Sequence, residues 1–262
     1  MVQDSVDDFG MQFTRHSNIE GVWGSQLLLK QSTYPFDLEK IQNKKICEVG
    51  SGSGRYLKNF LKFNPDKVTA IDPAESIHVA QKNVQDERIE FLKIDSTKME
   101  INEQFDYVFS LGVIHHIPRA DAAVENIYRS LKVNGQFVMW VYGYENNELY
   151  ILIFNNLRKF LSKIPDFLVE AISYFLALTT YTYGYLCKFF NLPLKQYFLN
   201  VFSQFSFTHR VYVIFDQLNP KYSKYYKKEE TIELLENAGF KIDEIYHRDK
   251  YSWTTIATKL PS

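Results

Sequence analysis

Strand and helix signals alternate along residues 44–144, and this alternation restricts the chain to a small set of folds. Short apolar runs typical of buried strands occur at 46–49, 67–71, 89–94, 105–110 and 136–141. Between them, apolar residues recur at helical spacing, as they do over 56–61. Strands that are separated by helices of this length require right-handed crossovers, so the segment predicts a parallel sheet and an α/β fold class.

The same pattern divides the chain into three parts. Residues 1–43 are a mixed N-terminal segment that we predict to be a helical flap, with a helix that Pro35 ends. Residues 44–144 carry the alternating signals, which resume over 207–262. The stretch between them, 145–206, is rich in Phe, Tyr, Leu and Ile and predicts a helical insertion after the fifth strand.

The C-terminal part adds one helix and two strands. A helix over 229–238 is closed by Gly239. Strand signals at 240–247 and 251–258 are separated by a short turn, which predicts an antiparallel hairpin.

The densest chemical signal is Glu48–Gly54, where a strand leads through a glycine-rich turn into a helix. Gly50 and Gly52 have no Cβ, so we expect the backbone of this turn to approach a bound nucleotide cofactor closely. Dinucleotide-binding turns have the spacing G-x-G-x-x-G, but Arg55 occupies the position of the third glycine. The Gly-Lys-Ser/Thr ending of a phosphate-binding loop is also missing. A tight turn without a ligand is the plainer interpretation.

Acidic residues follow the next two predicted strands. Asp72 lies 22 residues after Gly50, near the ~20 expected for a carboxylate that binds ribose hydroxyls. Its alternative role is to cap the helix that begins after Pro73. Asp95 follows the third strand, where it would accept a hydrogen bond from the adenine amine or form an Asx turn. Ligands of α/β sheets gather at these strand ends, so both residues favour a nucleoside site.

Five sequence elements together resemble the class I S-adenosylmethionine-dependent methyltransferases, of the small-molecule, type 11-like kind. They are Cys47–Arg55, Ile71–Asp72, Ile94–Ser96, Phe105–Ser110 and Leu131–Phe137, in this order. The resemblance covers 44–144, and it covers 229–258 as the family's terminal helix and hairpin. It implies a Rossmann-like sheet of seven strands, mostly parallel with an antiparallel C-terminal hairpin, and S-adenosyl-L-methionine as cofactor.

The resemblance also implies which residues contact the cofactor. Those that surround its methionine part are Glu48, Gly50, Ser51 and Gly52. Asp72 takes the ribose, with Pro73 beside it. Asp95 and Ser96 flank the adenine, and Leu111 lies near the sulfonium.

Methyl transfer from a sulfonium is an in-line displacement, so the main tasks of the protein are alignment and exclusion of water. A base is also needed when the acceptor is an alcohol. The fourth strand leads into a loop with His115 and His116, and histidine titrates near neutrality. Adjacent side chains point apart, so we predict His116, ahead of His115, as the catalytic base. The alternative is that one histidine packs the loop and the other is solvated.

Three further residues are predicted to contact the acceptor. Arg210 would hold a phosphate or carboxylate, and Asp216 would orient a hydroxyl. Tyr142, next to the fifth strand, completes the predicted acceptor site. An equally open interpretation is that the segment containing Arg210 and Asp216 packs back on the core.

Residues 167–187 of the insertion contain one charged residue, Glu170, and are long enough to consider as a membrane span. Their Ser, Thr, Tyr and Gly content makes them only moderately apolar, and a span would interrupt a soluble α/β domain. We favour a helical lid over the active site, shared with a homodimer interface, because lids exclude water. A surface that contacts a membrane or a lipid-linked acceptor stays open.

Charge and cysteine content exclude several other classes. The 30 basic and 31 acidic residues give a net charge of −1, so no global basic field would collect nucleic acid. The loop after the fourth strand also lacks the Asn/Asp-Pro-Pro-aromatic pattern of methyltransferases that act on nucleic-acid bases. Cys47 and Cys187 provide no disulfide framework, and the histidines have no metal-ligand spacing. We expect a cytoplasmic protein without a secretory signal, a metal or a nucleic-acid partner, and with membrane association if the insertion contacts lipid.

The predicted function is biosynthetic methyl transfer to an oxygen, or with less support a nitrogen or carbon, of a small-molecule, sugar, glycoconjugate or lipid-linked acceptor. One alternative is an NAD-dependent oxidoreductase on a similar fold, against which Arg55 and the terminal hairpin argue. The other is a catalytically silent nucleoside-binding scaffold, against which the intact glycine turn, Asp72 and Asp95 argue.

Overall fold

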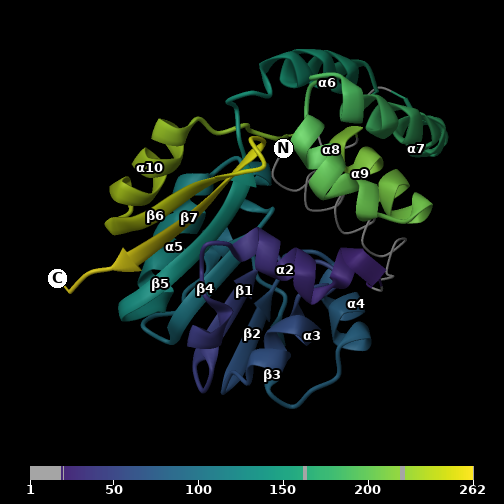
Figure 1. Cartoon of the computed structure of the whole chain (residues 1–262). Helices are drawn as coiled ribbons and strands as arrows, with labels where there is room; N and C mark the ends of the chain where they lie inside the picture. Colours follow the sequence, from purple (N-terminus) through teal and green to yellow (C-terminus); the bar gives the residue numbers. More distant parts are fainter. Residues whose placement is uncertain (1–18, 20, 162–163, 219–221, 262) are drawn as a thin grey trace.

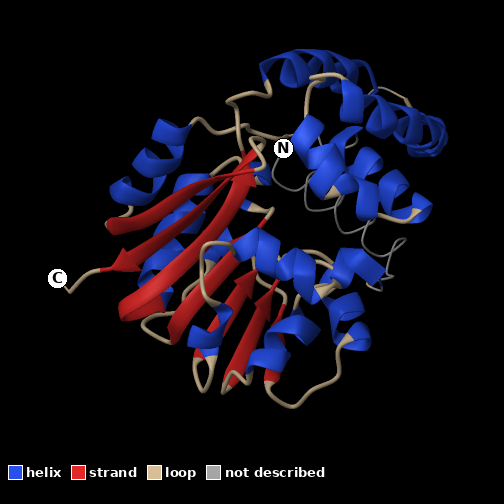
Figure 2. Cartoon of the chain, viewed as in Figure 1, coloured by secondary structure: helices blue, strands red, loops and turns tan. Residues whose placement is uncertain are grey.

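Seven strands form one sheet in the order β3-β2-β1-β4-β5-β7-β6 (Figure 1). The computed structural model describes residues 19, 21–161, 164–218 and 222–261, so residues 1–18 and 20 of the predicted N-terminal flap lie outside the described residues. Helices lie on both faces of the sheet, and further helices lie beyond the end of its strands (Figure 2). This arrangement confirms the predicted α/β fold class.

The first five strands are parallel. β1 (Lys45–Val49) lies between β2 (Lys67–Ile71) and β4 (Phe105–Leu111). β3 (Ile89–Leu92) pairs with β2, and β5 (Leu131–Tyr142) pairs with β4. β1 and β2 are buried along nearly their whole length, as expected for strands covered by helices on both faces. The carboxyl ends of β1, β2 and β4 therefore meet at one edge of the sheet.

The C-terminal hairpin completes the sheet as predicted. β6 (Phe240–Arg248) and β7 (Ser252–Lys259) are antiparallel neighbours. β7 lies between β6 and β5 and runs antiparallel to β5, with Trp140 opposite Thr254. The turn of the hairpin consequently lies at the same edge of the sheet as the carboxyl end of β5.

Two apolar cores lie on opposite faces of the sheet. One core contains residues of α2 (Gln26–Thr33), α3 (Leu57–Phe60) and α4 (Ser76–Asn83), and the other contains residues of α5 (Ala120–Ser130) and α10 (Lys228–Asn237). Successive side chains of a strand point to opposite faces, so Val138 of β5 joins the first core and Phe137 joins the second. Short 3₁₀ helices occur at Gly21–Gly24, Leu38–Ile41, Leu61–Phe63, Ser96–Lys98, Ile114–His116 and Phe202–Gln204.

The insertion after β5 is helical, and it extends further along the chain than predicted. Its helices are α6 (Glu148–Leu161), α7 (Asp166–Phe189), α8 (Lys195–Asn200) and α9 (Phe207–Leu218). The predicted boundary at residue 206 assigns α9 to the α/β domain. However, Phe215 and Leu218 of α9 share a buried apolar cluster with Leu161 of α6 and Val169 of α7. We therefore treat α6–α9 as one helical layer that ends at Leu218.

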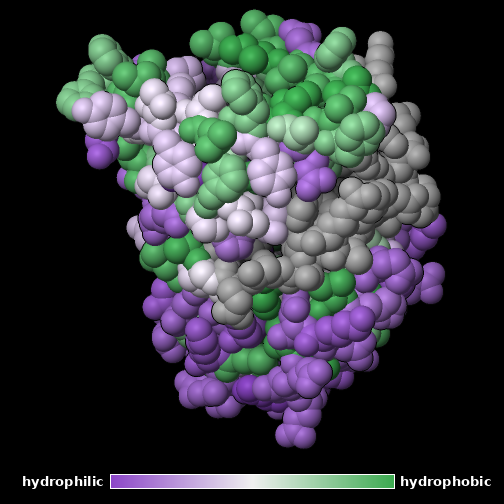
Figure 3. All heavy atoms as spheres, turned by 90° about the vertical axis from the view of Figure 1, so that its right-hand side faces the viewer, coloured by the Kyte–Doolittle hydropathy of each residue, from purple (hydrophilic) through white to green (hydrophobic). Residues whose placement is uncertain are grey.

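The outer side of the helical layer is unusually apolar. Large exposed side chains on α6 and α7 include Leu152, Phe160, Phe167, Tyr174, Phe175, Leu178, Tyr181, Tyr185 and Phe189. We call this surface the α6–α7 face. On the face drawn in Figure 3, apolar residues gather over the helical part of the molecule, whereas the α/β part is mainly hydrophilic. Within the described ranges, no helix has both the length and the apolar character needed to cross a bilayer.

Candidate functional site

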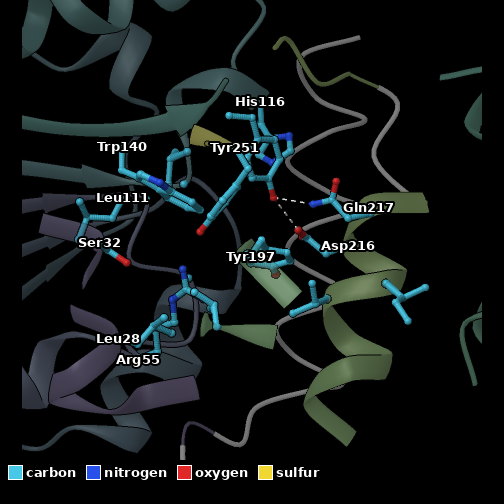
Figure 4. A pocket seen from close by; sticks show the side chains of 18 of the residues that line it. Leu28, Ser32, Arg55, Leu111, His116, Trp140, Tyr197, Asp216, Gln217 and Tyr251 are labelled. Carbon is cyan, nitrogen blue, oxygen red and sulfur yellow. Dashed lines mark hydrogen bonds between the residues drawn. The ribbon is translucent and has the colours of Figure 1, made fainter. Parts of the chain in front are cut away.

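A cavity of about 630 Å³ lies between the carboxyl ends of the strands and the helical layer. The turn after β1, Asp72, Asp95 and the loop after β4 line it from below, and α6–α9 line it from above. Figure 4 shows Trp140, Leu111 and Tyr251 on one side of this space and Asp216 and Gln217 of α9 on the other. The volume falls within the range of small-molecule and cofactor sites.

Glu48 gives the cavity a buried carboxyl group. The residue is 3% exposed, lines the cavity, and its Oε2 atom has no hydrogen-bond partner among the described residues. Burial raises the pKa of Glu48 to about 8 because desolvation disfavours the ionised form. The carboxyl is therefore mostly protonated at neutral pH, and a positively charged group placed beside it would favour its ionisation.

The glycine-rich turn is shaped by protein contacts. Gly50 has φ +81°, and a Cβ built there would lie 2.3 Å from Cγ2 of Val113 in the loop after β4. We expected the missing Cβ at this position to admit a cofactor, and this reason is wrong for Gly50 because Val113 occupies the space. Gly52, with φ +52°, donates its backbone N–H to a carboxylate oxygen of Asp72 at 2.9 Å. The turn is thus fixed from both sides.

Asp72 makes the capping contacts that were its alternative interpretation, and it also lines the cavity, as the predicted ribose contact requires. One carboxylate oxygen accepts from Gly52, and the other accepts from the Ala74 N–H at 2.9 Å and the Ser76 hydroxyl at 3.0 Å, at the start of α4. The residue is buried and lines the cavity together with Pro73. An ionised carboxylate has about four acceptor positions. Three are used here, which leaves capacity for a hydroxyl of a ligand.

Asp95 and Ser96 follow β3. β3 ends at Leu92, two residues earlier than the predicted strand, and Asp95 begins a 3₁₀ helix by accepting from the Thr97 N–H at 2.9 Å. The Asx turn that was the alternative interpretation is therefore present. Both Asp95 and Ser96 still line the cavity, as does Leu111 at the end of β4.

The two histidines of the loop after β4 have different surroundings. His115 is fully buried outside the cavity lining, with its ring centroid 3.9 Å from that of Tyr142, and neither ring nitrogen has a hydrogen-bond partner among the described residues. Burial lowers the pKa of His115 well below its ordinary value. This placement separates His115 from any acceptor in the cavity.

His116 lines the cavity, as the prediction of a base requires. Its Nδ1 atom lies 3.2 Å from the backbone oxygen of Tyr222. Desolvation lowers the pKa of His116 to about 4. The ring is therefore neutral at pH 7, and the near-neutral titration on which the prediction was based is lost through burial.

Polar side chains from β5 and α9 meet at the cavity wall. Gln217 donates to the Tyr142 hydroxyl at 2.6 Å, and that hydroxyl lies 3.4 Å from a carboxylate oxygen of Asp216 (Figure 4). The ring of Tyr142 also stacks on Tyr225 with centroids 5.6 Å apart. The structure thus brings the predicted residues Tyr142 and Asp216 together and adds Gln217 and Tyr225 to them.

Arg210 does not reach the cavity. Its guanidinium donates to the Thr180 hydroxyl at 3.0 Å and to the backbone oxygens of Phe205 and Ser203, and it stacks on the ring of Tyr181 at 3.9 Å. The predicted contact with a phosphate or carboxylate is therefore corrected. Arg210 joins α9 to α7 and to the segment before α9.

Several cavity residues were not predicted. Ser32 comes from α2, Arg55 from the glycine-rich turn, Tyr197 from α8, and Arg248 from the end of β6. The sequence contains no recognisable signal for Ser32, Tyr197 or Arg248, because the crossing of distant segments brings them to the cavity. Among the His, Cys, Asp and Glu side chains that the structure describes, no group of three or more could hold a metal ion.

The comparison with known sequences gives one family and several partial relatives. Residues 47–139 match the family described as methyltransferase domain. The chain is 25% identical over 131 residues to the tRNA U34 carboxymethyltransferase of Helicobacter pylori, covering 46% of this chain and 48% of that protein. It is 25% identical over 146 residues to the malonyl-[acyl-carrier protein] O-methyltransferase of Priestia megaterium, covering 55% and 52%. The chain thus spans about half the length of the curated relatives it matches.

Solved structures resemble the chain over more of its length. The 1,6-didemethyltoxoflavin-N1-methyltransferase of Burkholderia thailandensis, with S-adenosylhomocysteine bound, gives a TM-score of 0.57 at 16% identity and covers 99% of this chain and 88% of that one. A SAM-dependent methyltransferase from Aquifex aeolicus gives 0.51 at 17% identity, with 90% and 99% covered. At these identities the likeness concerns the fold.

Proposed function

We propose that this chain, whose residues 47–139 match the methyltransferase-domain family within a seven-stranded sheet, is a class I S-adenosylmethionine-dependent methyltransferase that transfers a methyl group to an oxygen of a small-molecule, sugar or lipid-linked acceptor. One observation carries the proposal. A single cavity joins a buried carboxyl with an unsatisfied oxygen, Glu48, to a second buried carboxyl, Asp72, and continues under an aromatic helical roof.

The residues present fit the cofactor. Oε2 of Glu48 suits the ammonium of the methionine part, since that oxygen is buried and has no partner among the described residues. Asp72 has acceptor capacity for a ribose hydroxyl. The other proposed contacts are Gly50, Ser51, Gly52, Pro73, Asp95, Ser96 and Leu111, all of which line the cavity. When bound, S-adenosylmethionine supplies a methyl group that its positive sulfur already activates.

The protein then has to align the acceptor, exclude water and receive a proton. The helical layer covers the cavity, which supports exclusion of water. Tyr142, with Gln217 and Asp216, offers hydroxyl, amide and carboxylate groups that would orient an acceptor hydroxyl. We keep His116 as the proposed proton acceptor because its neutral ring lines the cavity, and its lowered pKa makes it a weaker base than an ordinary histidine. His115 has no direct role in this scheme because it lies behind Tyr142.

The lining of the upper cavity supports an acceptor with a substantial apolar part. Tyr150, Phe154, Phe198 and Phe202 face this space from the helical layer. Relatives are named for tRNA and for a malonyl-carrier substrate, so the acceptor class does not follow from them. An acceptor that enters an aromatic cavity fits better than one read on an outer surface.

The α6–α7 face supports contact with lipid. Leu149 and Ile153 of α6 line the cavity and are also more than half exposed, so the apolar lining continues to the outer surface. Residues 171–187 contain no Asp, Glu, Lys or Arg. We include peripheral membrane contact at this face in the proposed function, as the route by which a lipid-linked acceptor would enter.

Titration calorimetry with S-adenosylmethionine and with NAD tests the proposal. We expect binding of S-adenosylmethionine alone, and at least tenfold weaker binding after Asp72→Asn, since a carboxylate bonded to a hydroxyl is exchanged for an amide. Glu87→Gln, on the exposed surface, is the matched control and should bind normally. Binding of NAD alone would favour an oxidoreductase, and binding of neither would favour a silent scaffold. In a separate assay with S-adenosylmethionine that carries a labelled methyl group, transfer of the label to bulk tRNA, with none to small acceptors, would contradict the proposed acceptor class.

The role of His116 requires a separate kinetic test. A positioned base typically contributes about 10²–10⁴-fold, so His116→Ala should lower turnover by at least a hundredfold with unchanged cofactor affinity. His78→Ala, a solvent-exposed histidine on α4, is the control. A loss of less than about tenfold would reject the assignment.

A further inference from the structure

Arg248 is a buried cation at the wall of the cavity. It ends β6, is 3% exposed and lines the cavity next to Trp140 and Tyr251. Its guanidinium carbon lies 5.6 Å from the ring centroid of Trp140 and 5.7 Å from that of Tyr251. These rings hold the planar group in a fixed place, so its donors have a defined direction.

The hydrogen bonds of Arg248 leave its charge uncompensated. One terminal nitrogen donates to the Ser32 hydroxyl and the other to the Gln31 side-chain oxygen, both at 3.3 Å, and Nε is buried without a partner among the described residues. Both acceptors are neutral, and no ion pair with a carboxylate of the described ranges accompanies them. A guanidinium is always charged in proteins, and burying it without a counter-charge is unfavourable. An anionic ligand group would supply both the missing charge and the missing acceptor.

Arg248 adjoins the aromatic part of the cavity, beside Tyr251. The cofactor side already has its own arginine, Arg55, directly after the glycine-rich turn. Arg248 instead comes from the hairpin beside β5, and it neighbours Tyr251, which contacts Tyr197 of α8 with ring centroids 4.4 Å apart. It therefore adjoins the aromatic space under the helical layer.

We propose that Arg248 binds the anionic headgroup, a carboxylate or phosphate, of an amphiphilic acceptor whose apolar chain occupies the aromatic part of the cavity. Guanidinium geometry suits both headgroups, because two N–H groups can donate to two oxygens at once. The proposal rests on the proposed function for the identity of the site as an acceptor site. The existence of an anion subsite rests on Arg248 alone.

Calorimetry with decanoate, decyl phosphate and 1-decanol tests the proposal, with and without S-adenosylhomocysteine. The wild-type protein should bind at least one anion about tenfold or more tightly than decanol, as a charge-assisted hydrogen bond to a buried cation allows. Comparison of the two anions identifies the headgroup. Arg248→Met should remove the preference for anions, with less than twofold change for decanol and S-adenosylhomocysteine. Lys250→Met removes a charge from the exposed neighbouring turn and should change nothing.

Each remaining result has a defined meaning. An unchanged anion preference in Arg248→Met would overturn the proposal, and weaker S-adenosylhomocysteine binding instead would assign Arg248 to the cofactor and overturn it too. Should the Met variant not fold, Arg248→Lys replaces it. Weaker anion binding that still exceeds decanol binding supports the subsite. Anion binding equal to that of the wild-type protein contradicts it. If the wild-type protein binds no S-adenosylhomocysteine but shows the Arg248-dependent preference, the anion subsite stands and the proposed function fails.

Discussion

At the scale of single residues, burial sets the charges in the cavity. Desolvation raises the pKa of Glu48 to about 8 and lowers that of His116 to about 4, so both side chains are predominantly neutral at pH 7. The carboxylate that would bind the cofactor's ammonium therefore forms only when that cation arrives. Cofactor binding and ionisation of Glu48 are expected to be coupled.

This coupling predicts proton release on binding of S-adenosylmethionine. The ligand favours ionised Glu48, so its apparent affinity should rise with pH between about 6 and 8, by at most about tenfold per pH unit. The sign follows from the raised pKa: below about 8 the free protein holds a proton that the complex loses. Calorimetry in buffers of different ionisation enthalpy should detect release of up to one proton at pH 7.

Glu48→Gln is the matched variant for this prediction, because it keeps the shape and cannot ionise. It should bind the cofactor more weakly at pH 7.5 and release fewer protons. Subtracting its proton release from that of the wild-type protein cancels the protons that the ligand itself releases. Equal proton release by the two proteins would show that Glu48 does not ionise on binding.

The place in the cavity could be predicted from the sequence better for the proposed cofactor residues than for the proposed acceptor residues. Glu48, Asp72 and Asp95 lie at strand ends, so their meeting at one edge follows from the order of elements. Arg210 and Arg248 show the opposite case. Both are arginines near the end of an element, and only tertiary packing decides that Arg210 holds α9 to α7 whereas Arg248 faces the cavity.

At the scale of elements, the glycine-rich turn and the loop after β4 fit against each other. Gly50 packs on Val113 and Gly52 donates to Asp72, so the turn keeps its shape through protein contacts. Glycine spacing predicted the turn but not its neighbour. The start of β5 was not predicted either, because the strand begins at Leu131, five residues before the predicted one. Leu131 pairs with Phe105 of β4, and the pairing continues from Gln136 after an irregularity.

Gly50→Ala should destabilise this junction. A non-glycine residue in the left-handed region costs about 1–2 kcal/mol, and the 2.3 Å approach to Val113 adds an overpacking cost of about 1–3 kcal/mol. Urea unfolding should show the loss. Val113→Ala in the same chain should recover a part of the overpacking cost, since Cβ of residue 113 still lies 2.9 Å from the added Cβ, and it should leave the backbone part.

Gly184→Ala is the control for this prediction. Gly184 lies in α7, where a Cβ would have open space, with no described atom outside its own turn of helix within 4 Å. Alanine should therefore stabilise the helix by about 0.5–1 kcal/mol. If Gly50→Ala were as stable as the wild-type protein, the loop after β4 would have to move away from the turn.

At the scale of the whole molecule, the helical layer has two apolar sides. Its inner side roofs the cavity, and its outer side is the α6–α7 face, where Phe167, Phe175 and Phe189 are each about two-thirds exposed. Aromatic composition predicted a helical insertion. The sequence also led us to expect a lid with a second, outward interface, but it did not show which residues lie on each side, because a helix's neighbours are set by the fold. Exposed apolar area of this kind marks an interaction surface.

The α6–α7 face predicts binding to lipid vesicles. Phe167→Ser, Phe175→Ser and Phe189→Ser combined remove three exposed rings without touching the cavity lining, so the triple variant should stay in solution while the wild-type protein floats with phosphatidylcholine–phosphatidylglycerol vesicles. Tyr34→Ser, an exposed aromatic residue of the α/β part, should float like the wild type. Affinities for S-adenosylmethionine should be equal in all three proteins, since the cofactor end of the cavity lies below the layer. If the wild-type protein remained in solution and sedimented as a dimer that the triple substitution dissociates, a second copy would cover this face instead of lipid.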